Sequence, residues 1–117
     1  MAAEWVPCGS GFIEADVIRW SEGVWQKPRS HRGRTVNVGE RVVIGEVLLD
    51  DRGWVSLLVR GCTVASEKPG HQISMLATNL EIRRKRPTIE KGKPERLLWS
   101  DETARAALVS RRDPHGV

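Results

Sequence analysis

The strongest constraint on the fold is a run of β-branched and aliphatic residues that turns back on itself in the middle of the chain. Arg41 to Leu49 is followed by Asp50-Asp51-Arg52-Gly53 and then by the return run Trp54 to Val64. Asp favours the start of a tight turn, and Gly adopts the positive φ that closes one. We therefore predict a long antiparallel hairpin with a turn at residues 50–53.

The side-chain pattern of this hairpin indicates how it is covered. On alternating positions Val43, Val47 and Leu49 share one face of the sheet. The opposite face also carries aliphatic residues, among them Val42 and Ile44, so we expect the strands to be covered on both sides. A chain of 117 residues fits a single domain with one core. A small barrel or sandwich satisfies these conditions.

Further strand and turn signals flank the hairpin. Tight connections between strands favour antiparallel pairing, because a parallel crossover needs a dozen or more residues. The sequence therefore predicts a mainly β fold of five or six antiparallel strands. Besides the hairpin, the predicted segments are a strand at 12–20, a turn at 21–23, a strand at 24–26, a turn at 68–71, a strand at 73–77 and a last strand that begins at Leu80.

The order of these signals resembles that of SH3-like small barrels. The resemblance is carried by Val36-Asn37-Val38-Gly39-Glu40-Arg41-Val42-Val43, by the Gly-closed hairpin and by the short turn before Leu80-Glu81-Ile82. It covers about residues 11–84 and concerns the fold pattern, without a family signature. SH3-like barrels include nucleic-acid binders, peptide binders and enzyme subunits, so the resemblance implies a small antiparallel barrel and leaves the function open.

The character of the sequence changes after Arg86. Two prolines and the run Lys91-Gly92-Lys93 are typical of a charged linker. Ser100 is then expected to cap a helix at about 100–112, whose narrow apolar face either docks on the barrel or binds a partner. The predicted organisation is an N-terminal lead-in at 1–10, a small β-barrel domain at 11–86 and a basic extension with a C-terminal helix at 87–117.

The net charge lies in this extension. Residues 1–80 contain nine basic and nine acidic side chains, whereas residues 81–117 contain ten basic and six acidic ones, which accounts for the net charge of +4. A basic segment of this kind suits a phosphate backbone, which it binds through counterion release. The candidate nucleic-acid-binding residues are Arg83, Arg84, Lys85, Arg86, Lys91, Lys93 and Arg96, together with the loop residues Lys27, Arg29, Arg32 and Arg34.

Tryptophan dominates the aromatic residues, with five Trp against one Phe and no Tyr. Because Trp is large and apolar, we expect most of the five to fill the core. Trp20 and Trp25 lie close to the basic loop and are the candidates for stacking on bases. Trp20, Trp25 and Trp54 gathered on the surface would instead indicate a pocket for a small molecule.

No arrangement of residues indicates catalysis. Gly9-Ser10-Gly11 leads into a predicted strand and not into a helix, which is typical of a turn and not of a phosphate-binding loop. Cys8 and Cys62 lack metal-ligand spacing, and the three histidines are scattered, so we expect neither a metal site nor a cofactor. We expect a protein without enzymatic activity.

Cysteine content and hydropathy bear on the compartment. Two distant cysteines and an N-terminus without a basic and then apolar leader favour a cytoplasmic location with free thiols. The longest apolar runs fall far short of the roughly 20 residues that a membrane-spanning helix needs. We therefore expect no membrane association.

Two functions compete on this evidence. The first is a nucleic-acid-binding module, in which the barrel presents a face and the basic segment contacts the phosphates of DNA or RNA. The second is a protein-interaction, assembly or inhibitor subunit that acts through the barrel edge or the C-terminal helix. The sequence separates neither these two functions nor DNA from RNA, and it does not define the oligomeric state.

Overall fold

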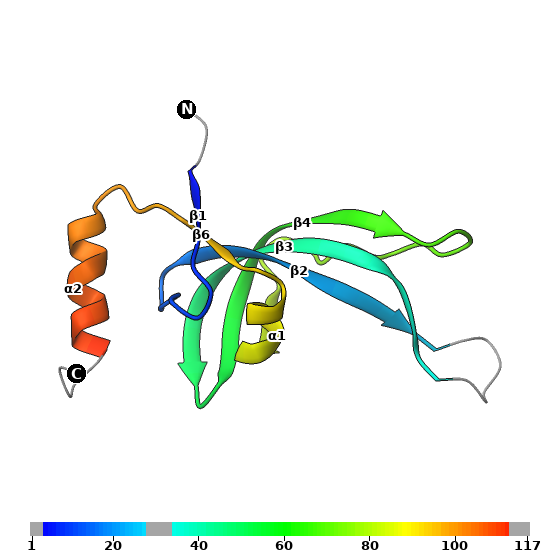
Figure 1. The fold of residues 1–117 in the computed structure, drawn as a ribbon, viewed down its shortest axis with the longest axis horizontal. Coiled ribbons are helices and arrows are strands. Elements are labelled where there is room, and N and C mark those ends of the chain that lie inside the picture. Colours follow the sequence, from blue (N-terminus) through cyan, green and yellow to red (C-terminus); the bar gives the residue numbers. More distant parts are fainter. Residues whose placement is uncertain (1–3, 28–33, 113–117) are drawn as a thin grey trace.

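The chain folds around a six-stranded sheet with two helices at its borders (Figure 1). The computed structural model describes residues 4–27 and 34–112. The strands are paired in the order β1-β6-β2-β3-β4-β5, all antiparallel, so the predicted mainly β, antiparallel fold is confirmed. In chain order the elements are β1 (Trp5–Pro7), β2 (Val17–Gln26), β3 (Val36–Asp51), β4 (Trp54–Glu67), β5 (Glu81–Lys85), α1 (Arg86–Lys91), β6 (Glu95–Leu97) and α2 (Glu102–Arg112).

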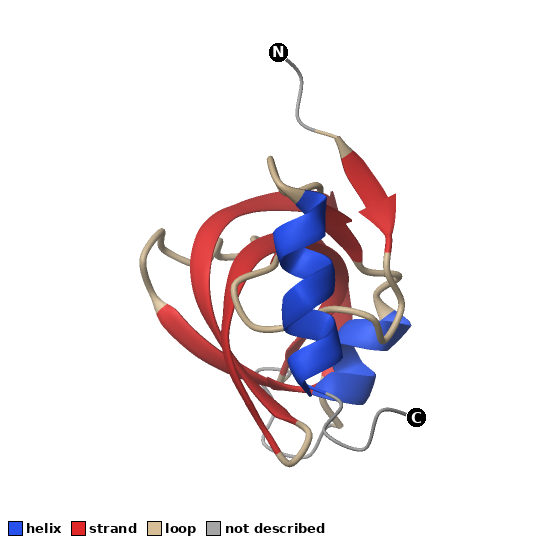
Figure 2. Cartoon of the chain, turned by 90° about the vertical axis from the view of Figure 1, so that its left-hand side faces the viewer, coloured by secondary structure: helices blue, strands red, loops and turns tan. Residues whose placement is uncertain are grey.

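The sheet is strongly curved and open (Figure 2). β1 and β5 are its two edges, and they are not paired with each other, so the SH3-like barrel is not confirmed. Three register shifts in the β3–β4 pairing bend these long strands. As a result β2 and β5 face each other although β3 and β4 lie between them in the sheet, and Nε of Arg84 is 2.9 Å from Oε1 of Glu22.

The central hairpin agrees with its prediction and is longer than expected. The turn consists of Arg52 and Gly53, both at positive φ (54° and 87°), so residues 50–51 belong to β3. A bulge between Val47 and Leu49 interrupts the predicted alternation. Val47 is buried, whereas half of Leu49 is exposed, so the expectation that they share a buried face is wrong for Leu49.

The core lies inside the curl of the sheet. All five tryptophans are described, and among them Trp20 alone is buried, so the expectation that most tryptophans fill the core is wrong. Burying a large apolar side chain contributes about 1.5–3 kcal/mol, which makes this cluster the main source of stability. Its members are Phe12, Ile18, Trp20, Val43, Val47, Val55, Leu57, Val59, Ile82 and Ile89.

β2 runs straight through the turn predicted at residues 21–23. These residues pair in register with residues 40–42 of β3. The predicted strand at 12–20 begins only at Val17. The turn prediction is wrong because a ladder formed with a neighbouring strand outweighs the local preference of Gly23.

The segment between β4 and β5 also differs in part from its prediction. The turn at 68–71 is confirmed, since His71 N–H donates to the Lys68 carbonyl (3.1 Å) and Gly70 has a φ of 81°. The strand predicted at 73–77 is absent, and this segment has no regular secondary structure. It is anchored by the buried Ile73, whose N–H donates to Oε2 of Glu67 (3.3 Å).

Residues 86–97 belong to the fold, and the linker predicted there is wrong. α1 places Ile89 in the core, and β6 pairs with both β1 and β2. Pro87 and Gly92, which are typical of a linker in the sequence, instead mark the two ends of α1. Pro87 occupies its first turn, where no backbone N–H is needed, and Gly92 follows its last residue.

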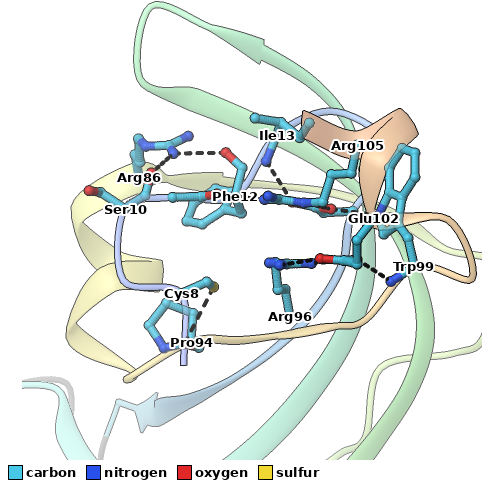
Figure 3. Close-up of polar contacts among 12 residues, drawn as sticks. Cys8, Ser10, Phe12, Ile13, Arg86, Pro94, Arg96, Trp99, Glu102 and Arg105 are labelled. Atoms are coloured by element: carbon cyan, nitrogen blue, oxygen red, sulfur yellow. Dashed lines mark hydrogen bonds and ion pairs between the residues drawn. The ribbon is translucent and has the colours of Figure 1, made fainter. Parts of the chain in front are cut away.

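The buried carboxylate of Asp16 helps to hold α2 through Arg105, which Figure 3 shows beside Trp99. Arg105 donates from Nε to Oδ1 of Asp16 (2.9 Å) and from Nη2 to Oδ2 (2.7 Å), and the Trp99 indole N–H donates to Oδ1 (2.7 Å). Asp16 is fully buried. The helix is capped by Asp101, which accepts the Ala104 N–H (3.1 Å), and not by Ser100 as predicted.

We expect Arg105→Ala to lower the free energy of unfolding by about 3 kcal/mol. Removing one partner of a buried ion pair leaves an uncompensated charge and costs about 3–5 kcal/mol, and Asp16 keeps two other donors, which favours the lower value. Urea unfolding followed by tryptophan fluorescence measures the change. The control is Arg111→Ala, an exposed arginine on the same helix, for which we expect a change within about 0.5 kcal/mol. Equal effects of the two substitutions would show that the ion pair does not hold α2.

Glu22 ties three strands together from inside the curl. Its carboxylate lies 2.9 Å from Nη2 of Arg41 on β3 and 2.9 Å from Nε of Arg84 on β5, and it also accepts the Trp20 indole N–H (3.2 Å). Burial on its own raises the pKa of this carboxyl. The hydrogen bonds and charges of Arg84 and Arg41 outweigh burial, so the pKa of Glu22 is lowered from 4.5.

We expect the stabilising effect of Glu22 to disappear in acid. A carboxyl whose pKa is lower in the folded than in the unfolded protein stabilises the fold above the unfolded pKa, here 4.5, and loses this effect as the pH falls through the folded pKa. The free energy of unfolding of wild type and of Glu22→Gln should therefore differ at pH 7 and converge below about pH 4.5. A difference that stays constant from pH 7 to pH 3 would contradict this account.

Candidate functional site

The basic residues around β5 are divided among different surfaces and do not form one patch. Ile82 and Arg84 point into the curl, whereas Arg83 and Lys85 are exposed on the other face of the strand. On that outer face both cations lie over the half-exposed ring of Trp54, at 4.9 Å and 5.3 Å from its centroid. The four consecutive basic residues of the sequence therefore cannot contact one phosphate backbone together.

Arg86 is a structural residue. Its guanidinium lies 2.6 Å from Oδ2 of Asp50 and 3.8 Å above the ring of Phe12, and it donates to the carbonyls of Phe12 (3.0 Å) and Ser10 (Figure 3). These contacts join the N-terminal segment to the end of the central hairpin. Nearly four-fifths of the Arg86 side chain is buried, so little of its charge faces solvent.

Arg96 is also occupied within the fold. Its Nη2 lies 2.7 Å from Oε1 of Glu102, the first residue of α2. This contact and the Trp99 N–H, which donates to Oε2, lower the pKa of the Glu102 carboxyl. Arg96 therefore ties β6 to α2.

Lys91 and Lys93 stand together beside β2. They flank Gly92, whose carbonyl accepts the Ser21 N–H (3.1 Å). A Cβ on Gly92 would lie 2.1 Å from the Ser21 carbonyl oxygen, so only glycine permits this approach. The close contact fixes the end of α1 against β2 and places both lysines at the rim of the space between these elements.

The basic loop is described only at its two ends. Lys27 and Arg34 are exposed, and Arg29 and Arg32 lie outside the described residues. Of the two stacking candidates, Trp20 is 1% exposed and cannot reach a ligand, whereas Trp25 is 62% exposed. Trp25 is therefore the one stacking candidate that the structure leaves accessible.

An open groove brings Trp25 and the two lysines together. It has a volume of about 1020 Å³ and lies between β2 and the end of α1, with β3 and β5 beneath. This volume is at the upper end of the range for small-molecule sites. The groove is lined by Ser21, Glu22, Gly23, Val24, Trp25, Glu40, Arg41, Arg84, Thr88, Lys91, Gly92 and Lys93.

The groove is positively charged. Four basic and two acidic side chains line it, a net of two positive charges. Glu22 compensates part of the charge of Arg41 and Arg84 and holds their guanidinium groups in place. Lys91 and Lys93 make no ion pair with a carboxylate in the described part of the chain and are both exposed, so their charge faces solvent.

Lys93 adopts a backbone conformation that favours glycine. Its φ is 53°, in the left-handed region, which costs a residue with a Cβ roughly 1–2 kcal/mol. The same conformation occurs at Ala15, Arg52 and Asn79, so it does not by itself mark a functional position. At Lys93 it belongs to the end of α1, where the Lys93 N–H donates to the Glu90 carbonyl (3.2 Å).

Five polar residues of the groove are not among the site residues predicted from the sequence: Ser21, Glu22, Glu40, Arg41 and Thr88. The sequence predicts a turn at Glu22 and assigns Arg41 to a strand without a binding role. One signal was present: Glu22 follows Trp20 by two positions and so shares the inward face of β2. A charged residue on an inward face predicts a buried ionic partner.

Three other kinds of site find no support in the described residues: a metal site, a reactive cysteine and a pocket lined by tryptophans. Within the described residues no group of three or more His, Cys, Asp or Glu side chains could hold a metal ion. Burial, assisted by the charge of Asp16, raises the pKa of the free Cys8 thiol to about 11, so it is protonated and a poor nucleophile at neutral pH. Trp20, Trp25 and Trp54 do not form one pocket, because Trp20 is buried and Trp54 does not line the groove.

None of the described helices is long and apolar enough to cross a membrane. Comparison of the chain with protein-family models, curated proteins and solved structures finds no match. The functional argument therefore depends on the geometry of the groove.

Proposed function

We propose that this chain is a small non-enzymatic module that binds nucleic acid in the groove between β2 and α1. The observation that carries the proposal is the presence of the exposed Trp25 and four basic side chains in a single groove. Aromatic faces and cations are the two groups that a nucleic acid requires, since bases stack on the first and phosphates pair with the second.

The four cations of the groove have different roles in this proposal. Lys91 and Lys93 carry exposed, uncompensated charge and are the phosphate contacts that release counterions. Arg41 and Arg84 are held by Glu22 and act as oriented donors at the floor of the groove. Lys27 and Arg34 follow β2 and precede β3, so they extend the basic surface beyond Trp25.

A protein-interaction role is the second candidate, and α2 favours it. This helix is attached through Arg105 and the Arg96–Glu102 pair, while its apolar residues Ala104, Ala107 and Leu108 are exposed. An amphipathic helix of this kind can dock in the groove of a partner. We rank it second because the structure shows no counterpart surface of defined chemistry.

We also propose that the fold is an open relative of the SH3-like barrels. Support comes from the consecutive antiparallel strands β2, β3, β4 and β5, followed by the short helix α1 and by β6, which returns to pair with β2. The free thiols of Cys8 and Cys62 support a cytoplasmic location. Neither proposal decides the function, because such barrels serve many.

We expect the double variant K91A/K93G to lose affinity for nucleic acid. With two phosphate contacts removed, the slope of log affinity against log salt should become shallower by about 1.4 for a single strand, and affinity at 0.1 M salt should fall by roughly 10- to 30-fold. Glycine at position 93 also relieves the left-handed backbone, so the variant should fold normally. Fluorescence anisotropy of a labelled oligonucleotide at several salt concentrations measures both quantities.

The matched control is R52G/K68A. It removes the same charge and likewise places glycine at a left-handed position, because Arg52 has a φ of 54°. Neither residue lines the groove. Binding should be nearly unchanged, and an equal loss in both variants would show that only overall charge matters and that the groove is not the site.

A further inference from the structure

The ring of Trp25 lies exposed at the rim of the groove. Gly23, two residues earlier, has no side chain, and a Cβ there would lie 3.1 Å from the indole nitrogen of Trp25 and 2.8 Å from Nδ2 of Asn37. The ring therefore lies against the Gly23 backbone, with its other side exposed. The Asn37 side chain is held in turn, since its Oδ1 accepts the Gly39 N–H (3.1 Å).

Trp25 differs in this respect from the other exposed tryptophan. The ring of Trp54 is covered by the cations of Arg83 and Lys85. Within the described part of the chain, no cation lies over the ring of Trp25. Trp25 therefore presents a free aromatic face, and Trp54 does not.

We propose that the occupant of the groove is a single-stranded nucleic acid, with an unpaired base stacked on Trp25 and the adjoining phosphates on Lys91 and Lys93. This inference rests on the proposed function. A base inside a duplex is already stacked on both faces, so it reaches an aromatic side chain only after it is flipped out, at a cost of a few kcal/mol. A single strand offers such bases without that cost.

The dimensions of the groove agree with a single strand. Its volume of about 1020 Å³ leaves room for a few nucleotides of a single strand. The helix that borders the groove, α1, has only six residues and packs into the core through Ile89, so it is not free to enter the major groove of a duplex.

The test compares three labelled probes of equal length by fluorescence anisotropy at 0.05 M and 0.15 M salt: a dT oligomer, a U oligomer and a mixed-sequence DNA duplex. We expect the single strands to bind at least tenfold more tightly than the duplex. Trp25→Ala should weaken single-strand binding by about 5- to 150-fold, the range for loss of one base–aromatic stack. The duplex affinity of this variant should stay the same.

The matched control is Trp54→Ala, which removes an exposed tryptophan whose ring is covered by cations. It should leave single-strand binding within about twofold of wild type. Circular dichroism verifies the fold of both variants, and Trp25→Phe, which keeps an aromatic face, should restore most of the affinity. Tighter binding of the dT oligomer would identify single-stranded DNA as the ligand, and tighter binding of the U oligomer would identify RNA. Either result supports the proposal.

Three outcomes would overturn it in distinguishable ways. If duplex and single strands bind equally and neither affinity changes in Trp25→Ala, the single-strand inference is wrong. The proposed nucleic-acid function would then depend on phosphate contacts alone. Loss of binding in Trp54→Ala but not in Trp25→Ala would move the site to the outer face of β5. No binding of any probe at 0.05 M salt would reject the proposed function itself.

Discussion

The carboxylate of Glu22 joins the strands that the curl of the sheet brings together. β2 and β5 are separated by two strands and share no backbone hydrogen bond, yet Glu22 joins them through Arg84 and joins both to β3 through Arg41. A buried ion pair adds little net stability when it is compared with well-packed apolar side chains. These ion pairs instead specify how the three strands lie relative to one another, because both guanidinium groups must reach the same carboxylate.

The same carboxylate determines what the groove can bind. Along β2 the inward face changes from Ile18 and Trp20, which are fully buried, to Glu22 and then to the half-exposed Val24. The core ends at this point and the groove begins. Because Glu22 holds Arg41 and Arg84 by their guanidinium groups, the floor of the groove is polar and rigid. An anionic ligand would meet donors that are already ordered, which reduces the entropy cost of binding.

Local features of the sequence were predicted well, and long-range ones were not. The central hairpin depends on β-branched strands and on Gly53, which are neighbours in the chain, and it was recovered. The turn at 21–23 and the linker after Arg86 failed because pairing with β3 and burial of Ile89 override local preferences. Four of the predicted site residues line the groove, namely Trp25, Arg84, Lys91 and Lys93, and their role in binding stays a prediction, whereas Trp20 is buried. The ion pairs could not be predicted, because Glu22 and Arg84 are 62 residues apart and Asp16 and Arg105 are 89 apart.

The arginines and the lysines of the basic segment differ in how much of their charge is compensated within the fold. Arg84, Arg86, Arg96 and Arg105 each hold a carboxylate and join distant elements, as a planar group with several fixed donors does well. An arginine whose charge is already compensated by a protein carboxylate displaces fewer counterions from a phosphate backbone. Lysine is a flexible point charge and serves less often as a tether. At the groove it is the lysines on either side of Gly92 that keep their charge in solvent, and one of them does so from a strained backbone. The contrast between tethering arginines and exposed lysines is therefore the reason why we propose an anion-binding surface at the end of α1, several residues beyond the densest basic run of the sequence.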